Sequence, residues 1–374
     1  MRIALDATPL REARTGVPQT VFELLDALPA DVEVIPYVPS GRALLARARR
    51  QPDDLPPGTR LLPVPARVFM RAWALSDWPP ADRWLGDADV VHGTNFVVPP
   101  MRRRPTTVTV HDCWCARHPE RCLPERAAFT NLVQRAVDRG AWLHVSTKYM
   151  AREVAEVYGA TERVAVVPFG VPPVGSPGGG DVSLPAAVAD GPFVLALGSV
   201  DPRKAYDALV RAFGRATAGG DLGDLRLVVA GPDGPGRPAL DAALATLPGD
   251  VAARVVVLGW VDDAVRRALL SRATVLAYPS LYEGFGFPVL EAMAAGVPVV
   301  ATAAGGVPEV AGDAAALVAV GDDDALAGTL TRVVTDDALR ARLVAAGHAR
   351  AATFTWERTA TGMVELWRRL ADAG

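Results

Sequence analysis

The sequence predicts an α/β protein made of two doubly wound domains, each with a parallel sheet. Its 374 residues are too many for one compact core. Continuous runs of Val, Ile and Leu alternate with amphipathic helical patterns along the chain, which is typical of parallel strands buried on both faces. A stretch dense in Pro, Gly and Ser at residues 170–192 favours a domain boundary there.

Twelve apolar runs are expected to be strands, six on each side of that stretch. The first six are RIALDAT, VEVIPYV, DADVVHGT, TTVTVHD, AWLHVS and RVAVVPFG; the second six are FVLALGS, LRLVVAG, RVVVLGW, TVLAYPS, VPVVAT and AALVAV. We therefore expect an N-terminal domain at 1–172, a linker at 173–190 and a C-terminal domain at 191–353. Residues 354–374 have helical periodicity. They either cross back to the N-terminal domain or end the second domain.

Composition excludes several classes of protein. The net charge of −3 argues against the broad basic face that binds nucleic acid. No apolar run reaches 18 residues, and the N-terminal MRIALDATPL lacks the pattern of a signal peptide. We therefore expect a cytoplasmic protein without membrane spans.

The three cysteines lie in one short stretch, HDCWCARHPERC. An odd number of cysteines does not suggest a disulfide framework. The spacing of His111, Cys113, Cys115, His118 and Cys122 fits no common zinc site, because a second Cys-x-x-Cys or His-x-x-x-His pair is missing. We expect small apolar thiols near a loop, with a structural zinc site as the minor alternative.

The segment EGFGFPVLEAM places two glutamates around a glycine-rich loop that leads into an apolar helix. Pro288 suits the first helical position. The backbone amides of residues 287–290 should then lack carbonyl partners and carry partial positive charge, which predicts a diphosphate site. Glu291 could accept hydrogen bonds from two ribose hydroxyls. In the alternative, Glu291 complements the helix dipole and Glu283 is a solvated loop residue.

The E-x₇-E spacing, followed by AMAAGVPVVAT and GGVPEVAGDAAALV, resembles the donor-binding signature of retaining glycosyltransferases of family 4, which have the GT-B architecture of two Rossmann-like domains across a cleft. The resemblance covers nearly the whole chain, including LDATPLREARTGVPQTVFELLDAL, TVHD, VSTKYMAREVAEVYG, VVPFGV and ALGSVDPRKAYDALVRAF. It implies transfer of a mannose-, glucose- or rhamnose-type hexose from a GDP- or UDP-linked donor to an acceptor hydroxyl, without a further cofactor.

The resemblance also implies the site residues. Arg203 and Lys204 would neutralise the donor diphosphate, as a guanidinium and an ammonium can at a helix start. His111 would contact the donor sugar, and Glu283 would position it. The predicted catalytic set is Glu283, His111, Arg203 and Lys204; the predicted donor-binding set is Gly16, Arg203, Lys204, Val261, Gly284, Phe285, Gly286, Phe287, Leu290 and Glu291. The structural alternative for Arg203 and Lys204 is a solvated helix start, and for His111 a strand-end histidine with satisfied hydrogen bonds.

Under the implied mechanism the acceptor attacks the face that the diphosphate leaves, and a phosphate oxygen takes the proton. Neither a metal nor an enzymic base is required. The run Asp322 to Asp324 could suggest a metal site, but it precedes a helix, so we expect it to cap that helix. The base should be recognised near Trp260 or Val261.

The acceptor, a glycan, lipid-linked saccharide or natural product, is expected on the N-terminal domain. Its segments VFMRAWALSDWPPADRWL and VHGTNFVVPPMRRRP are rich in aromatic and basic residues. The MRRRP sequence with Trp73, Trp78 and Phe96 could contact the inner face of a membrane. A solvated loop is the alternative.

The sequence departs from the family pattern at three positions, one of which is Asp233, where a short glycine turn is more typical. Pro18 replaces a common glycine in the loop after the first strand, and Ala205 replaces the usual asparagine after Arg-Lys. Two other functional classes also stay open: a GT-B epimerase or phosphorylase, and a sugar-nucleotide-binding protein without activity. A phosphorylase needs a lysine for pyridoxal phosphate, and the chain contains two, Lys148 and Lys204.

Overall fold

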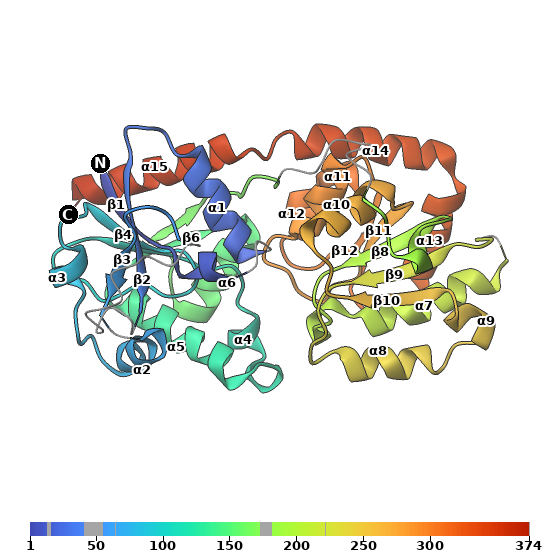
Figure 1. Cartoon of the computed structure of the whole chain (residues 1–374), viewed down its shortest axis with the longest axis horizontal. Helices are drawn as coiled ribbons and strands as arrows, with labels where there is room; N and C mark the ends of the chain where they lie inside the picture. The colour runs from blue at the N-terminus through green and yellow to red at the C-terminus, as the bar shows by residue number, and fades with distance from the viewer. Residues whose placement is uncertain (13–15, 41–54, 64, 173–181, 221, 374) are drawn as a thin grey trace. The chain divides into compact units, whose positions relative to one another are not determined.

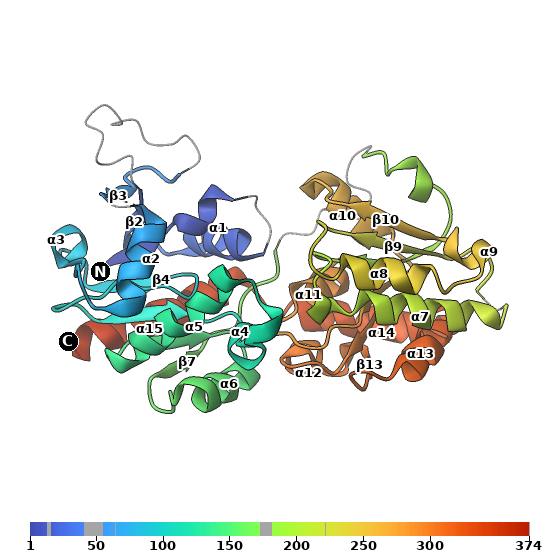
Figure 2. The ribbon, with the colours of Figure 1, turned by 90° about the horizontal axis from the view of Figure 1, so that it is seen from below.

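The computed structural model describes residues 1–12, 16–40, 55–63, 65–172, 182–220 and 222–373 (Figure 1). They form two compact units: unit 1 contains Met1–Gly170 and Thr355–Gly374, and unit 2 contains Val171–Phe354. Each unit has one parallel sheet with helices on both faces (Figures 1 and 2). Of the predicted linker, residues 173–181 lie outside the described residues.

The sheet of unit 1 has the order β3-β2-β1-β4-β5-β6-β7, and all its pairs are parallel. All six predicted strands are confirmed. The additional strand, β3, has three residues and pairs at the edge, and so short a segment gives no periodic signal. The strands are β1 (Arg2–Asp6), β2 (Glu33–Pro39), β3 (Arg60–Leu62), β4 (Val90–Gly93), β5 (Thr106–Thr109), β6 (Trp142–Val145) and β7 (Val164–Val166).

Helices cover this sheet and bury the apolar strand residues. They are α1 (Val17–Ala27), α2 (Ala66–Leu75), α3 (Asp82–Leu85), α4 (Trp114–Arg117), α5 (Pro124–Asp138), α6 (Lys148–Tyr158) and α15 (Trp356–Ala373), with 3₁₀ turns η1 (Thr8–Arg11) and η3 (Pro119–Arg121).

The C-terminal helix α15 belongs to unit 1, where it lies beside α1 (Figure 1). Its apolar face, which includes Met363 and Leu370, is buried. The Thr359 hydroxyl donates to the Pro168 carbonyl at 2.8 Å. The indole of Trp367 packs edge-on against the His92 ring. An amphipathic helix of this kind gains most of its stability from the surface it covers.

The sheet of unit 2 has the order β10-β9-β8-β11-β12-β13, again with parallel pairs, and all six predicted strands are confirmed. The strands are β8 (Phe193–Leu197), β9 (Arg226–Ala230), β10 (Val255–Gly259), β11 (Val275–Tyr278), β12 (Val299–Thr302) and β13 (Ala316–Val318). Because β8 and β11 are neighbours, the loops that follow them emerge side by side at the carboxyl edge, where ligands bind in such sheets.

Helices α7, α8 and α13 pack on one face of this sheet, and α10 and α11 on the other (Figure 1). The helices are α7 (Tyr206–Ala218), α8 (Arg237–Leu244), α9 (Gly249–Ala252), α10 (Asp263–Arg272), α11 (Phe287–Ala294), α12 (Val307–Ala311), α13 (Asp323–Thr335) and α14 (Asp337–Ala351), with 3₁₀ turns η4 (Ala186–Val188), η5 (Pro202–Lys204) and η6 (Gly312–Ala314). No helix within the described ranges is long and apolar enough to cross a membrane.

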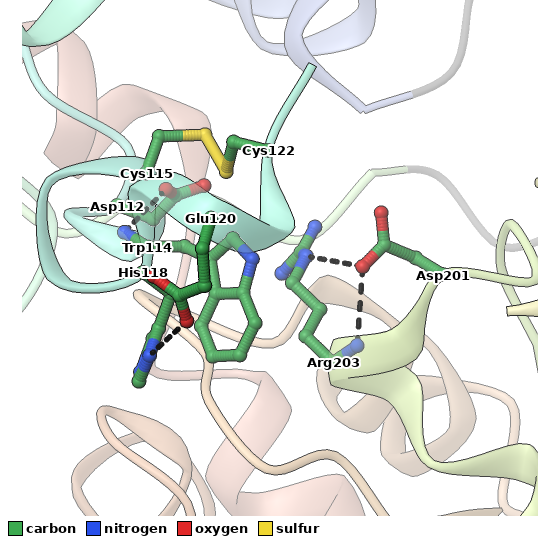
Figure 3. The surroundings of a disulfide bond; sticks show 8 residues. All are labelled: Asp112, Trp114, Cys115, His118, Glu120, Cys122, Asp201 and Arg203. Atoms are coloured by element: carbon green, nitrogen blue, oxygen red, sulfur yellow. Dashed lines mark hydrogen bonds and ion pairs between the residues drawn. A yellow bond between two sulfur atoms is a disulfide. The ribbon is translucent and has the colours of Figure 1, made fainter. Parts of the chain in front are cut away.

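The expectation of unpaired thiols is wrong for two of the three cysteines. Cys115 and Cys122 form a disulfide (Figure 3). The short elements α4 and η3 turn the chain back, so that the two Cα atoms lie 5.6 Å apart, within the range that a disulfide needs. Cys113 remains a thiol and is buried. No cluster of metal-ligating side chains is found in the described part of the chain.

The aromatic residues that were expected in a surface patch divide between core and surface. Trp73 is fully buried, stacks on Phe69 and donates its indole N–H to the Pro79 carbonyl at 3.1 Å. The expectation for Trp73 is therefore wrong, because its helical position faces the sheet. Phe96 packs between the rings of Phe129 and His111, whereas Trp78 is exposed.

Candidate functional site

Arg203 and Lys204 lie in the turn η5, directly after β8. The carboxylate of Asp201 caps this turn by accepting from the Arg203 backbone amide at 3.1 Å (Figure 3). The Arg203 side chain also lies near Asp201, with 3.8 Å between Nε and Oδ1. A local cap thus places both cations at the carboxyl edge of the sheet.

Glu283 binds both cations. Its Oε1 accepts from Lys204 Nζ at 2.6 Å, and its Oε2 accepts from Arg203 Nη1 at 3.2 Å. Lys204 Nζ also donates to the Tyr278 hydroxyl at 2.8 Å. The residues are about eighty positions apart in sequence, and the pairing of β8 with β11 brings them together. Three residues of the predicted catalytic set are therefore neighbours in the structure.

The charges in this cluster are strongly coupled. Burial raises the pKa of Glu283, but the charges of Lys204 and Arg203, with the hydrogen bond from Lys204, outweigh burial and lower that pKa to about 2. Burial lowers the pKa of Lys204, and the Glu283 carboxylate opposes this effect. A carboxylate 2.6 Å from an ammonium is an ion pair at neutral pH.

An ammonium has three N–H donors. Within the described residues, Lys204 Nζ uses two of them, toward Glu283 and Tyr278. One donor is therefore left for a ligand. The Arg203 side chain keeps about a fifth of its surface exposed.

The loop that holds Glu283 depends on glycines. The Glu283 carbonyl accepts from the Gly306 amide at 2.8 Å. A Cβ on Gly305 would lie 2.1 Å from that carbonyl oxygen, so a side chain there would displace the loop. Gly286, at φ 95°, adopts a left-handed conformation at the start of α11. Gly305 and Gly306 were not in the predicted site, although GGVPEV formed part of the family signature.

The amino end of α11 offers fewer amides than the sequence predicted. The helix begins at Phe287, and Pro288 has no N–H. The Val289 amide donates to the Gly286 carbonyl at 3.0 Å, so the expectation that it lacks a partner is wrong. A tight first turn satisfies this amide internally. Leu290 is fully buried, and the rings of Phe285 and Phe287 pack edge to face.

Glu291 lies on the buried side of α11 and forms an ion pair with Arg266. Arg266 of α10 donates from Nη1 to Glu291 Oε2 at 2.5 Å. Burial raises the pKa of Glu291, which Arg266 partly offsets. Sequence reasoning missed Arg266, because a single arginine on an otherwise amphipathic helix carries no signal of a distant partner. Val261 lies just before α10, and the neighbouring Trp260 is 63% exposed.

Two predicted residues belong to unit 1. His111 follows β5, and its Nε2 lies 3.0 Å from the Thr94 carbonyl. A carbonyl accepts only, so Nε2 carries the hydrogen and Nδ1 presents a lone pair. Burial lowers the pKa of His111, so the ring is neutral. Gly16 precedes α1 with φ 60°, a conformation that favours glycine, and Pro18 occupies the first turn of that helix, where proline is tolerated.

The aspartate run after β13 caps a helix, as predicted. The Asp322 carboxylate accepts from the Ala325 amide at 2.8 Å. Asp323 pairs with Arg211 across the face of unit 2, with 3.0 Å between Oδ2 and Nε. These contacts account for the acidic run without a metal.

Each half of the chain matches a family model of glycosyltransferases. A family model described as Glycosyltransferase Family 4 matches residues 14–174, and one described as Glycosyl transferases group 1 matches residues 191–336. The chain is 27% identical to the O-antigen chain mannosyltransferase B of Escherichia coli, over 99% of this chain and 100% of that protein.

The phosphatidyl-myo-inositol mannosyltransferase of Mycolicibacterium smegmatis is 30% identical, over 50% of this chain and 47% of that protein. The chain thus spans about half the length of this second relative. Among solved structures, the sucrose-phosphate synthase of Thermosynechococcus elongatus has a TM-score of 0.74 at 22% identity, with both chains fully covered. This last likeness concerns the fold.

Proposed function

Because this chain is a glycosyltransferase with a family 4 domain and a group 1 domain, we propose that it is a retaining hexosyltransferase that uses a nucleoside diphosphate sugar and no metal. One observation carries the proposal. Arg203 and Lys204 lie together at the carboxyl edge of the unit 2 sheet, held by Glu283, and Lys204 keeps a donor for a ligand. Paired cations of this kind suit a diphosphate.

In the proposed reaction, the bond between the sugar C1 and the diphosphate oxygen breaks while the acceptor oxygen bonds to C1 on the same face. The acceptor proton passes to the leaving phosphate oxygen, so the products are a glycoside and a nucleoside diphosphate. Arg203 and Lys204 offset the charge that develops on the diphosphate. Glu283, with a pKa of about 2, stays ionised at neutral pH and acts by positioning these cations.

Glu291 accepts from a pentose hydroxyl, Trp260 or Val261 lies against the base, and the loop from Gly284 to Phe287 approaches the diphosphate and sugar. The neutral His111 accepts a hydrogen bond from a sugar hydroxyl at Nδ1. Gly16 allows the backbone to approach the phosphates or the acceptor closely.

Mannose is the first sugar to test, since the relative matched over its full length is named a mannosyltransferase. A panel of GDP- and UDP-linked mannose, glucose and rhamnose, with and without saccharide acceptors, identifies the donor by nucleotide release. Glycoside formation with retained anomeric configuration supports the proposal. Nucleotide binding without turnover would favour a binding protein, and interconversion of the donor sugar an epimerase.

Substitution of Arg203 by Ala tests the diphosphate contact. We expect nucleoside diphosphate affinity to fall at least tenfold, as for the loss of a charged hydrogen bond. Arg237→Ala is the matched control, since Arg237 makes ion pairs to Asp233 and Asp241 on the surface of α8. Equal affinity in Arg203→Ala and wild type would contradict the site.

Helix α2 supports a further part of the proposal, peripheral contact with an anionic membrane. Val68 and Leu75 of α2 are 54% and 83% exposed, Arg67 and Arg71 of α2 are also exposed, and Trp78, three residues after the helix, is 70% exposed. Basic and apolar side chains on one surface suit an anionic bilayer. We expect sedimentation with phosphatidylglycerol vesicles that is lost in Leu75→Ser/Trp78→Ser. Equal sedimentation of that variant would contradict membrane contact through α2.

A further inference from the structure

A charge cluster with one buried member, Glu291, joins α10 to α11 in unit 2. Arg266 Nη1 lies 2.5 Å from Glu291 Oε2, and Arg266 Nε lies 3.2 Å from Asp263 Oδ1. The Glu291 side chain is 7% exposed and that of Arg266 16% exposed. Asp263 thus fixes the guanidinium from one side while Glu291 engages it from the other.

The ion pair involves one of the two carboxylate oxygens of Glu291. Arg266 engages Oε2, and no hydrogen bond reaches Oε1 from any of the described residues. A buried carboxylate is costly unless its charge is compensated. The arginine supplies that compensation through one oxygen and leaves the other able to accept.

We propose that Arg266 is a positioning residue of the donor site, which holds Glu291 ionised and directs its Oε1 to one hydroxyl of the donor pentose. This inference rests on the proposed function, in which Glu291 contacts that pentose. It adds that the pentose hydroxyl contacts Oε1, since the Arg266 guanidinium lies against Oε2.

A merely structural ion pair would predict a different outcome. It would stabilise the packing of α10 on α11, and its removal would lower stability while affinity per folded molecule stayed constant. A positioning role instead predicts an effect that depends on the ligand. Ligands with a pentose should lose affinity, and inorganic pyrophosphate should not.

The experiment compares wild type with Arg266→Met by calorimetric titration. The ligands are UDP, GDP, their 2′-deoxy and 3′-deoxy forms, and inorganic pyrophosphate. We expect Arg266→Met to bind the parent nucleotide about tenfold more weakly and pyrophosphate equally well. One deoxy form should bind wild type about tenfold more weakly than its parent, and this difference should vanish in the variant.

Acid pH gives a second readout. The charged groups that act on Glu291 are Arg266 and Asp263 of α10, and from α14 the His348 ring faces Gly296 beyond the other end of α11. Protonation of Glu291 should weaken nucleotide binding as the pH falls. Without Arg266 the pKa of Glu291 rises, so this loss should begin at a higher pH in Arg266→Met. In Glu291→Gln it should be absent.

Arg267→Met is the matched control, because Arg267 also pairs with Asp263 but makes no contact with Glu291. If Arg266→Met does not fold, Arg266→Lys is tested instead. We expect a smaller loss of nucleotide affinity in this variant, because lysine keeps the positive charge but lacks the planar guanidinium group. Wild-type affinity in the folded Arg266 variant for every ligand would overturn this inference alone. A wild type that bound no nucleotide would overturn the proposed function together with it.

Discussion

The ammonium of Lys204 lies 2.6 Å from Glu283 Oε1, and both side chains are less than a tenth exposed. The two residues come from the loops after β8 and β11, so their pairing depends on the sheet order. A buried pair of this kind is worth little relative to an apolar pair, but breaking one side leaves an expensive charge behind.

Lys204→Met should lower the free energy of unfolding of unit 2 by about 3 kcal/mol, because Glu283 loses its nearest cation. The double variant Lys204→Met/Glu283→Gln should lose less than the sum of the single variants. Differential scanning calorimetry and hydrogen exchange in the strands of unit 2 measure both. Additive losses would show that the two side chains are not coupled.

The stability of unit 1 should fall as the pH falls from about 6.5 to about 4. His144 Nε2 donates to the Val167 carbonyl and Nδ1 accepts from Thr109, and burial lowers the pKa of His144 to about 4. The unfolded state therefore binds a proton that the folded state does not in this window, so stability rises with pH. His92 acts in the same direction, whereas Asp6, whose pKa burial raises to about 6, opposes part of the effect.

Urea unfolding at several pH values, followed by tryptophan fluorescence, tests this. Seven of the eight tryptophans lie in unit 1, since Trp260 is the one within residues 171–354. His144→Gln should reduce the slope of stability against pH but not remove it, because His92 still titrates. A slope equal to that of wild type would contradict the assignment.

Reduction of the disulfide should lower the stability of unit 1 by about 2 kcal/mol, since a short closed loop restricts the unfolded chain modestly. The expected thiol count in denaturant is one before reduction, from Cys113, and three after it. Cys115→Ser/Cys122→Ser should unfold like the reduced protein. Three reactive thiols without reductant would show that the bond does not form.

Ala205→Gly should raise the stability of unit 2 by about 0.5–1 kcal/mol. Ala205 has φ 49° and ψ 42°, a left-handed conformation that costs a residue with a Cβ about 1–2 kcal/mol, and the greater freedom of glycine in the unfolded chain offsets part of the gain. Ala208→Gly, within α7, is the control and should instead cost about 1 kcal/mol. If both variants lose stability equally, Ala205 is not strained.

The sequence by itself determined the strands and the class of fold. Each unit has its apolar runs buried on both faces, and their composition is enough to identify them because burial on two faces removes the alternation of polar residues. The strand β3 was not predicted, because three residues at the edge of a sheet show no periodicity. The resemblance to family 4 also predicted Arg203, Lys204, Glu283 and Glu291 as residues of the donor site.

Only the tertiary structure decided the partners of those charges. Sequence patterns report what is near along the chain, whereas the order of parallel strands decides which loops meet. This order brings Glu283 to Lys204, and the packing of α10 on α11 brings Glu291 to Arg266. The disulfide likewise depended on a chain reversal through α4 and η3, which the cysteine count alone does not reveal.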